Sequence, residues 1–209
     1  MLPGVLGPRA AETCARVLTQ RPSGGSDRGM IVGVAGRNGA GKGEVIKLLE
    51  ARGFLSLSLS DVIREELRKQ GLEESRDLMI NTGRRLRAEG GPKVLGERLL
   101  TMMEPERDYA VDSVRHPAEV EAMRGGAGRF VLLWVAADEQ VRFTRMQSRG
   151  RSGDPTTLEE LRSLEARELG SADPAAQQLN AVEALADYAL CNDHGLSELS
   201  AELEKVLPA

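Results

Sequence analysis

Three glycines and a lysine in the first quarter of the chain have the types and spacing of a phosphate-binding site. Gly36, Gly39, Gly41 and Lys42 stand in the sequence GRNGAGK, which fits the pattern GxxxxGK. Glycine lets the backbone adopt positive φ and approach an anion closely, so that consecutive N–H groups point inward. The lysine adds a mobile positive charge for the outer oxygens of a polyphosphate. The pattern therefore predicts a phosphate-binding loop, termed the phosphate loop (residues 36–42).

The segments on both sides of the phosphate loop support this prediction. Residues 30–35 form an apolar run typical of a buried strand, and residues 44–52 have a helical pattern. A helix that begins at the loop presents its N-terminus, with its partial positive charge, to the same anion. The alternative is a glycine-rich surface turn with an exposed lysine, which does not account for the flanking strand and helix. The residues expected to bind a nucleotide here are Gly36, Asn38, Gly39, Ala40, Gly41, Lys42, Gly43 and Glu44.

Two residues directly after the phosphate loop depart from the common pattern. Gly43 stands where most such loops have the Ser or Thr that holds Mg²⁺, and Glu44 follows it. A metal ion at this loop therefore needs another ligand. Asp112 lies near the end of a predicted strand at residues 109–114, and a carboxylate there faces the ligand crevice of a parallel sheet. We expect Asp112 to hold Mg²⁺ through water molecules.

Length and composition limit the class of protein. The chain has 209 residues, of which 41% are hydrophobic and 29% charged, as in an ordinary globular domain. The net charge of −4 argues against a general nucleic-acid or membrane-surface binder, and no apolar stretch is long enough to span a membrane. Cys14 and Cys191 are far apart and belong to no metal-binding motif, which favours reduced thiols in a cytoplasmic protein. The oligomeric state is not indicated.

Hydrophobic patterns divide the chain into an N-terminal extension and one main domain. Residues 1–29 are rich in Gly and Pro and predict a flexible extension, followed by a domain at residues 30–207. Residues 71–104 have a helical pattern without a strand. Alternation of strands and helices predicts an α/β fold with a parallel sheet of about five strands and right-handed crossovers. The remaining predicted strands are residues 54–59, 130–137 and 187–192, with Ser60 or Asp61 capping the helix after the first of them.

Several short stretches resemble the P-loop nucleoside monophosphate kinases, which include adenylate kinase. These stretches are GAGKGE at 39–44, SDVIREE at 60–66, RGRSGDP at 149–155, EARELG at 165–170 and ADYAL at 186–190. Within that superfamily they are similar to a group of uncharacterised adenylate-kinase-like proteins of archaea and bacteria, also compared with dephospho-coenzyme A kinase. The resemblance implies a P-loop three-layer sandwich that binds ATP and Mg²⁺. It also implies a helical acceptor-binding insertion at residues 71–104 and a lid at residues 149–167.

The resemblance assigns two arginines to the acceptor. Arg64 and Arg115 match the positions that grip the acceptor's phosphate, and the planar fork of a guanidinium suits that anion. We expect Arg87 to reach into the cleft from the insertion. Glu119, where adenylate kinases have glutamine, either faces the acceptor's base or lies on the surface, and we expect the surface position. His116 is expected to be structural.

On the donor side, the resemblance points to the predicted helix that starts at Asp138. Arg145 and Arg149 are four residues apart and share a face, like the pair that contacts the donor's adenine and phosphates in adenylate kinases. Asn192 lies in a turn expected to flank the donor base. Arg149 and Arg151 are the arginines expected to act in catalysis from the lid. Arg162 and Arg167 are further lid arginines that would neutralise charge on the transferred phosphoryl group.

The sequence leaves three functions open. The first is transfer of the γ-phosphoryl group of ATP to a nucleoside or deoxynucleoside monophosphate, with Lys42, Arg64, Arg115, Arg149 and Arg151 as catalytic residues. The second is a dephospho-coenzyme A kinase reaction on a ribose hydroxyl, with Asp61 as the base. The third is an ATP-binding regulatory protein without transfer, which weak metal contacts at Gly43 and Glu44 would favour. In the two kinase readings the partners are small-molecule nucleotides.

Overall fold

The computed structural model describes residues 29–126, 128–151, 153–169 and 175–207. Residues 1–28, nearly all of the predicted N-terminal extension, lie outside this part. Gly29 is described, and its N–H donates a hydrogen bond of 2.7 Å to the carbonyl oxygen of Pro105. The last residue of the predicted extension is therefore attached to the main domain.

The centre of the domain is a parallel sheet with strand order β2-β3-β1-β4-β5. Strand β1 lies in the middle and pairs with β4 along its whole length, from Met30 opposite Arg129 to Gly36 opposite Val135. Because β1 leads directly into the phosphate loop, the loop begins at the middle of the sheet edge. The strands are β1 (Met30–Gly36), β2 (Leu55–Ser58), β3 (Tyr109–Asp112), β4 (Arg129–Ala136) and β5 (Tyr188–Cys191).

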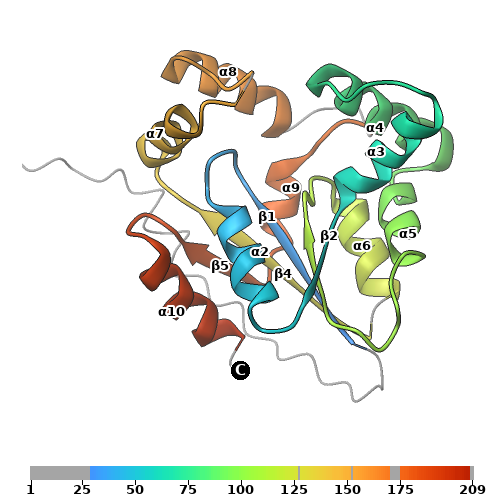
Figure 1. Cartoon of the computed structure of the whole chain (residues 1–209), viewed down its shortest axis with the longest axis horizontal. Coiled ribbons are helices and arrows are strands. Elements are labelled where there is room, and N and C mark those ends of the chain that lie inside the picture. The colour runs from blue at the N-terminus through green and yellow to red at the C-terminus, as the bar shows by residue number, and fades with distance from the viewer. Residues whose placement is uncertain (1–28, 127, 152, 170–174, 208–209) are drawn as a thin grey trace, which may run out of the picture.

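Helices connect the strands and cover both faces of the sheet (Figure 1). Most of them lie in segments whose helical pattern the sequence predicts. Helix α9 has 6 residues and was not predicted, because so short a segment shows little periodicity. The helices are α2 (Lys42–Glu50), α3 (Leu59–Lys69), α4 (Arg76–Gly90), α5 (Val94–Leu100), α6 (Pro117–Gly126), α7 (Glu139–Arg149), α8 (Leu158–Leu169), α9 (Leu179–Ala184) and α10 (Leu196–Val206).

The apolar side chains form one core on each face of the sheet. Along β4, Leu132 and Trp134 belong to the core shared with helices α3 to α6 and α9. Their neighbours Leu133 and Val135 point the other way, into the core shared with α2 and α10. A strand buried on both faces in this way requires helices on both sides. The expected three-layer α/β sandwich is confirmed.

Two element boundaries differ from the prediction for local reasons. Ser58 caps α3, since its hydroxyl accepts from the N–H of Ser60 at 3.2 Å and its own N–H donates to Asp61 at 3.0 Å. This capping box starts the helix earlier than a cap at Ser60 or Asp61 would. Strand β3 ends at Asp112 because Ser113 has a φ of 67°, in the left-handed region that interrupts a strand.

Two expectations from composition have different outcomes. No helix in the described ranges is long and apolar enough to cross a membrane. Cys191, at the end of β5, is disulfide-bonded, so the expectation of a reduced thiol at this position is wrong. Cys14 lies outside the described residues.

Candidate functional site

The phosphate loop has the backbone geometry that its glycines predict. Gly36, Gly39 and Gly41 have φ angles of 146°, 75° and 97°. Gly39 is also required for a steric reason, since a Cβ atom there would lie 2.6 Å from the carbonyl oxygen of Arg142 in α7. This position therefore requires glycine both for its φ angle and for contact with the neighbouring helix.

Lys42 and the start of α2 complete the loop. The Nζ atom of Lys42 donates to the carbonyl oxygens of Gly36 at 2.9 Å and Arg37 at 3.0 Å. The amine thus lies across the loop. Gly41 is the N-cap of α2 and has no side chain to accept from the first N–H groups of the helix. No side chain caps this first turn, where the N–H of Glu44 donates to the carbonyl oxygen of Gly41 at 2.9 Å, and the N-terminus of a helix favours an anion.

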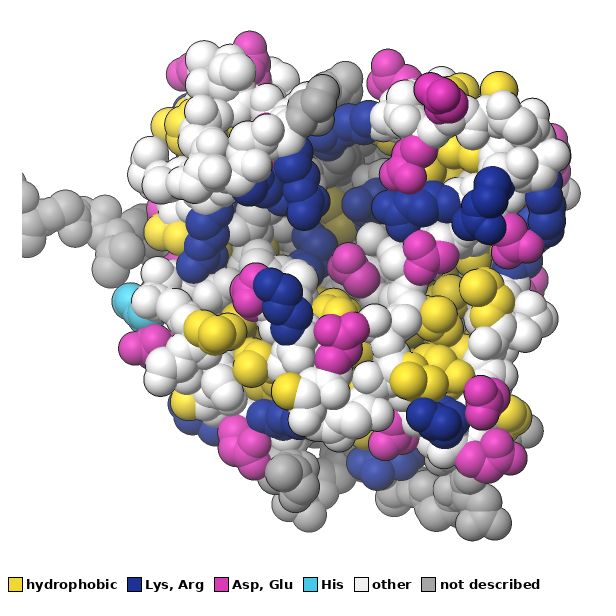
Figure 2. Space-filling view, in the orientation of Figure 1, with side chains coloured by type: hydrophobic (Ala, Val, Ile, Leu, Met, Phe, Trp, Pro, Cys, Tyr) yellow, Lys and Arg dark blue, Asp and Glu magenta, His cyan; other side chains and the backbone are white. Residues whose placement is uncertain are grey.

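The loop opens into a cavity of about 1850 Å³, which we term the central cavity. Pockets for a single small ligand usually measure about 300–1000 Å³, so the central cavity has room for two ligands of nucleotide size. Its walls include the loop, the end of β3, helices α3 and α4, and Arg145, Arg149, Arg151, Gly153 and Asp154. Lysine and arginine outnumber aspartate and glutamate on these walls. Figure 2 shows the hollow lined by basic side chains, between α7 and α8 on one side and α3 and α4 on the other.

Two of the residues expected on the donor side lie next to the loop. The buried side chain of Asn192 donates from Nδ2 to the carbonyl oxygen of Ala40 at 2.8 Å, and its Oδ1 accepts from Arg145 at 3.4 Å. The Nη1 atom of Arg145 is buried and has no hydrogen-bond partner within the described ranges. Both side chains line the central cavity. Asn192 therefore holds the loop and orients Arg145, which keeps a free donor.

Asp112 has an unsatisfied carboxylate oxygen on the cavity wall. Its Oδ1 atom is buried and accepts no hydrogen bond from the described part of the chain. Since β3 pairs with β1, Asp112 lies at the same sheet edge as the phosphate loop. A buried oxygen without a partner is costly unless a ligand or water satisfies it. Within the described ranges, no group of three or more His, Cys, Asp or Glu gathers, so the other ligands of a bound Mg²⁺ would be phosphate oxygens and water.

The two arginines expected to bind the acceptor both lie on the cavity wall, but they differ in their ion-pair partners. Arg64 donates to Asp61 at 2.8 Å and to Glu74 at 3.1 Å. The guanidinium of Arg115 forms no ion pair with a described residue, although its backbone N–H donates to Glu119 at 2.9 Å. An anionic acceptor would therefore have to compete with two carboxylates for Arg64, but with none of the described ones for Arg115.

The expected surface position of Glu119 is wrong. Glu119 is fully buried; its Oε2 accepts from the N–H groups of Arg115 and His116 at 2.9 and 3.0 Å, and its Oε1 accepts from Arg87 at 2.6 Å. The amides at the start of α6 and the arginine of α4 surround this carboxylate. Arg87 lines the central cavity, as expected, with its charge compensated by Glu119. His116 is buried, and its Nδ1 accepts from the Ala118 N–H, which suits the expected structural position.

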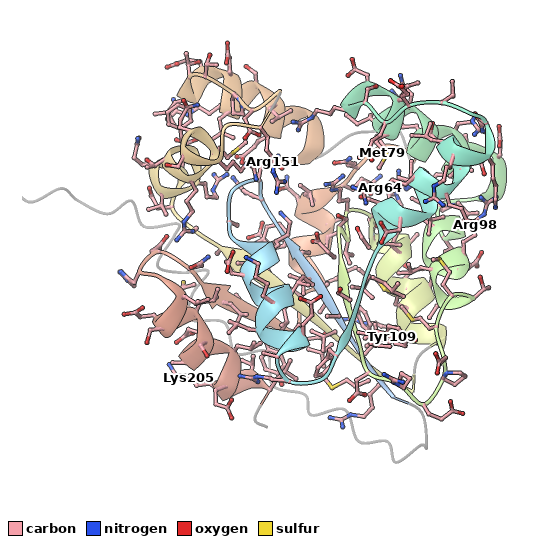
Figure 3. The ribbon with its side chains drawn as sticks, in the orientation of Figure 1. Arg64, Met79, Arg98, Tyr109, Arg151 and Lys205 are labelled. Carbon is pink, nitrogen blue, oxygen red and sulfur yellow. The ribbon has the colours of Figure 1, made fainter. Side chains whose placement is uncertain are left out.

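The predicted lid loop is closed on itself by Asp154. Both oxygens of this carboxylate accept from Arg149 at 2.8 Å, and one also accepts from the N–H of Arg151 at 3.3 Å. The hydrogen bonds from Arg149 lower the pKa of Asp154. Figure 3 shows Arg151 and Arg64 on opposite sides of the central cavity. Sequence reasoning missed Asp154, although it lies within the motif RGRSGDP.

Two further residues, Arg162 and Gln177, differ in their position relative to the central cavity. Arg162 does not line the central cavity; it forms an exposed ion pair of 2.7 Å with Glu139, so the structure does not bring it to the site. The side chain of Arg167 lies outside the described part. Gln177 was not predicted, yet it lines the cavity, and its Oε1 is buried without a partner among described atoms. No motif in the sequence marks it.

The sequence of this chain is similar to a family model and to known proteins. Residues 35–162 match a family model described as an AAA domain. A UPF0200 protein of Hyperthermus butylicus is 36% identical over 181 residues, which cover 85% of this chain and 93% of that protein. A UPF0200 protein of Thermococcus kodakarensis is 34% identical over 184 residues, which cover 85% of this chain and 96% of that protein.

Comparisons with solved structures extend the likeness to the fold. The shikimate kinase from Bacteroides thetaiotaomicron gives a TM-score of 0.54 at 16% identity, covering 86% of this chain and 99% of that chain. The protein TT1252 from Thermus thermophilus gives 0.53 at 23% identity, covering 86% and 96%. At these identities the likeness concerns the fold alone. The expected P-loop kinase-like fold is confirmed.

The burial of Glu119 generates a prediction about stability. We expect Glu119→Gln to lower the free energy of unfolding by about 3–5 kcal/mol, because it leaves the buried Arg87 without its counter-charge. Glu121 is a matched control on the same helix: its side chain is 60% exposed and pairs with Lys93 at 3.1 Å. We expect Glu121→Gln to cost less than about 1 kcal/mol. Urea unfolding measures both, and equal effects would contradict the assigned role of Glu119.

The lowered pKa of Asp154 predicts a pH dependence. The Arg149–Asp154 pair contributes fully above the pKa that the carboxyl has in the unfolded chain, and the contribution is lost as the pH falls through the lowered folded value. We expect Asp154→Asn to reduce stability by at most about 1 kcal/mol at neutral pH, since the pair is partly exposed. The difference between variant and wild type should shrink toward low pH. Thermal melting over a pH series measures it, and a constant difference would argue against the pair as its source.

Proposed function

The chain belongs to the UPF0200 family and carries an AAA domain, and we propose that it is an ATP-dependent phosphotransferase. In this proposal the acceptor is itself phosphorylated, in particular a nucleoside or deoxynucleoside monophosphate. One observation carries the proposal: a single cavity has the phosphate loop on one wall and the arginines at positions 64 and 115 on another. Two anionic ligands, each with its own basic partners, would meet between these walls.

The donor phosphates are assigned to the loop. The N–H groups at the start of α2 and the open turn at Gly39 and Gly41 would bind the phosphate chain. Lys42 would leave its two carbonyl partners and pair with the β and γ oxygens. Asp112 would hold Mg²⁺ with its unsatisfied oxygen, and the bound ion neutralises charge between the β- and γ-phosphates. Asn192 keeps the loop in place and orients Arg145 toward the donor.

The acceptor phosphate is assigned to Arg64 and Arg115. Their planar forks would align its oxygens with the γ-phosphorus, and this transfer needs no side-chain nucleophile. Arg149 and Arg151, from the opposite wall, would neutralise negative charge on the transferred group. Closure of the predicted lid at residues 149–167 over the predicted insertion at residues 71–104 would exclude water.

The position of Asp61 supports a phosphate acceptor over a ribose hydroxyl. Transfer to a hydroxyl requires a base with a free oxygen near the acceptor. In Asp61 both oxygens are engaged, one with Arg64 at 2.8 Å and the other with the N–H of Ser58 at 3.0 Å. Its side chain is a helix-capping group, and Asp61 is absent from the residues that line the central cavity. This arrangement leaves the dephospho-coenzyme A reaction without the base proposed for it.

An acceptor panel tests the proposal. Purified protein is incubated with ATP and Mg²⁺ and with each ribo- and deoxyribonucleoside monophosphate or dephospho-coenzyme A, and ADP formation is measured. We expect at least one monophosphate to raise ADP formation well above the rate without acceptor. Lys42→Met should lower that rate by about a hundredfold or more, because the phosphates lose their mobile cation.

The other outcomes decide between the alternatives. Stimulation only by dephospho-coenzyme A would identify the hydroxyl reaction. ATP binding without stimulation by any acceptor would support a regulatory nucleotide-binding protein. A Lys42→Met variant that turns over at the wild-type rate would refute the assignment of the loop.

Gly43 generates a second prediction about the metal. A Cβ atom at Gly43 would have no heavy atom within 4 Å, so a serine fits without displacing a neighbour. We expect Gly43→Ser to supply the hydroxyl ligand that most such loops provide, and so to reduce about severalfold the Mg²⁺ concentration that gives half-maximal activity. Gly43→Ala fills the same space without a hydroxyl and serves as the control. Equal Mg²⁺ dependence in the two variants would exclude Gly43 from the metal site.

A further inference from the structure

A buried ion pair lies behind the phosphate loop, outside the central cavity. Arg142 of α7 donates to both carboxylate oxygens of Glu165 of α8, and the two residues are 3% and 5% exposed. Neither residue lines the central cavity. The pair therefore does not contact a ligand bound there, although Glu165 begins the stretch EARELG at residues 165–170.

Arg142 also contacts the loop itself. Its Nη1 donates to the carbonyl oxygen of Asn38 at 3.1 Å, and its Nε donates to the carbonyl oxygen of Ala137, after the end of β4, at 3.0 Å. Its own carbonyl oxygen lies against Gly39, at the place where a Cβ atom would clash. The side chain and backbone of Arg142 thus hold two consecutive residues of the loop.

Glu165 adds a second connection. Its carboxylate lies 3.7 Å from the guanidinium of Arg37, which precedes Asn38 in the loop. One carboxylate from the lid segment therefore lies between two arginines, one on α7 and one in the phosphate loop. Helix α8 is joined to the loop through Arg37 directly and through Arg142 indirectly.

The physical consequence concerns the shape of the loop. A segment with three glycines has little conformational preference of its own, so its geometry before ligand binding must be imposed by its neighbours. Desolvation of two charges makes a buried ion pair a poor source of net stability, but removal of one partner is costly, so the pair favours one arrangement over others. Here that arrangement includes the orientation of the Asn38 peptide, which determines where the neighbouring loop N–H groups point.

We propose that Arg142 and Glu165 are positioning residues that preorganise the phosphate loop for ATP and couple it to the lid helix α8. This inference rests on the proposed function only in that the loop binds ATP. Since coupling is reciprocal, a nucleotide on the loop also stabilises the docking of α8. The predicted lid segment is thus connected to the phosphate loop through Glu165 of α8. This connection does not involve the arginines of the lid that line the central cavity.

The test measures ATP affinity, with a control that joins the same two helices. Glu165→Gln removes the charge and keeps the size of the side chain. We expect it to raise the dissociation constant for ATP, followed by fluorescence of a labelled analogue, about tenfold. Glu139→Gln is the matched control, because Glu139 of α7 pairs with Arg162 of α8 at 2.7 Å on the exposed side. We expect this variant to bind ATP like the wild type.

A double variant separates positioning from a general effect on stability. In Arg142→Gln with Glu165→Gln no charge of the pair remains, so we expect the chain to fold even where the single variant does not. Positioning predicts that ATP affinity stays weak in the double variant, because the hydrogen bond from the Arg142 guanidinium to the carbonyl oxygen of Asn38 is missing. It also predicts faster hydrogen exchange of the loop N–H groups in the ATP-free protein. Wild-type ATP affinity in the folded double variant would overturn the inference.

Kinetics with an active acceptor provide a further readout. We expect Glu165→Gln to raise the KM for ATP and to leave the KM for the acceptor unchanged, since the loop contacts only the donor. ATP binding that weakens as described while no acceptor is ever phosphorylated would refute the kinase proposal and uphold this inference. Unchanged ATP affinity in a folded Glu165→Gln variant, or an equal loss in Glu139→Gln, would overturn the inference alone. A wild-type chain that does not bind ATP would overturn both.

Discussion

The site depends on how a glycine-rich loop is held in shape by segments that lie far away in the sequence. The loop starts at the central strand β1, which places it at the middle of the sheet edge. From one side the side chain of Asn192 donates to the carbonyl oxygen of Ala40, and from another Arg142 donates to that of Asn38. Both contacts are made to carbonyl oxygens, so neither of them occupies an N–H group of the loop. The glycines allow the loop backbone many conformations, and the contacts with the surrounding protein restrict it to one of them.

Charge compensation divides the polar residues of the site into two groups. Arg87 and Arg149 have carboxylate partners within the protein, Glu119 and Asp154, which hold them in place. Arg115, one nitrogen of Arg145 and one oxygen of Asp112 have no such partner among the described residues. In this second group, the atoms of Arg145 and Asp112 are buried as well as unsatisfied, which is costly, so they indicate where ligands would be most strongly favoured. The group contains both signs of charge, which suits a magnesium nucleotide and an anionic acceptor.

Residues whose neighbours in space are distant in the sequence differ most from the sequence-based expectation. The positive φ angles of the loop glycines were predictable, because the motif itself requires them. Glu119 was expected on the surface, since nothing nearby in the sequence shows that Arg87, from a helix earlier in the chain, meets it. The left-handed Ser113 also has no sequence signal, because serine rarely adopts that conformation without tertiary contacts. The pairing of Arg142 with Glu165 likewise joins two motifs that the sequence presents separately.

The sequence by itself determined the class of the protein: a buried parallel sheet, helices on both faces, and a phosphate loop at the end of the first strand. Periodicity and glycine spacing are local properties, and the physics of strands, helices and turns acts over a few residues. Only the tertiary structure decided which charges are compensated and which are free, because that depends on which distant side chains meet. It thereby separated Arg115 and Asp112, which keep atoms available to ligands, from Arg142 and Glu165, which satisfy each other behind the loop.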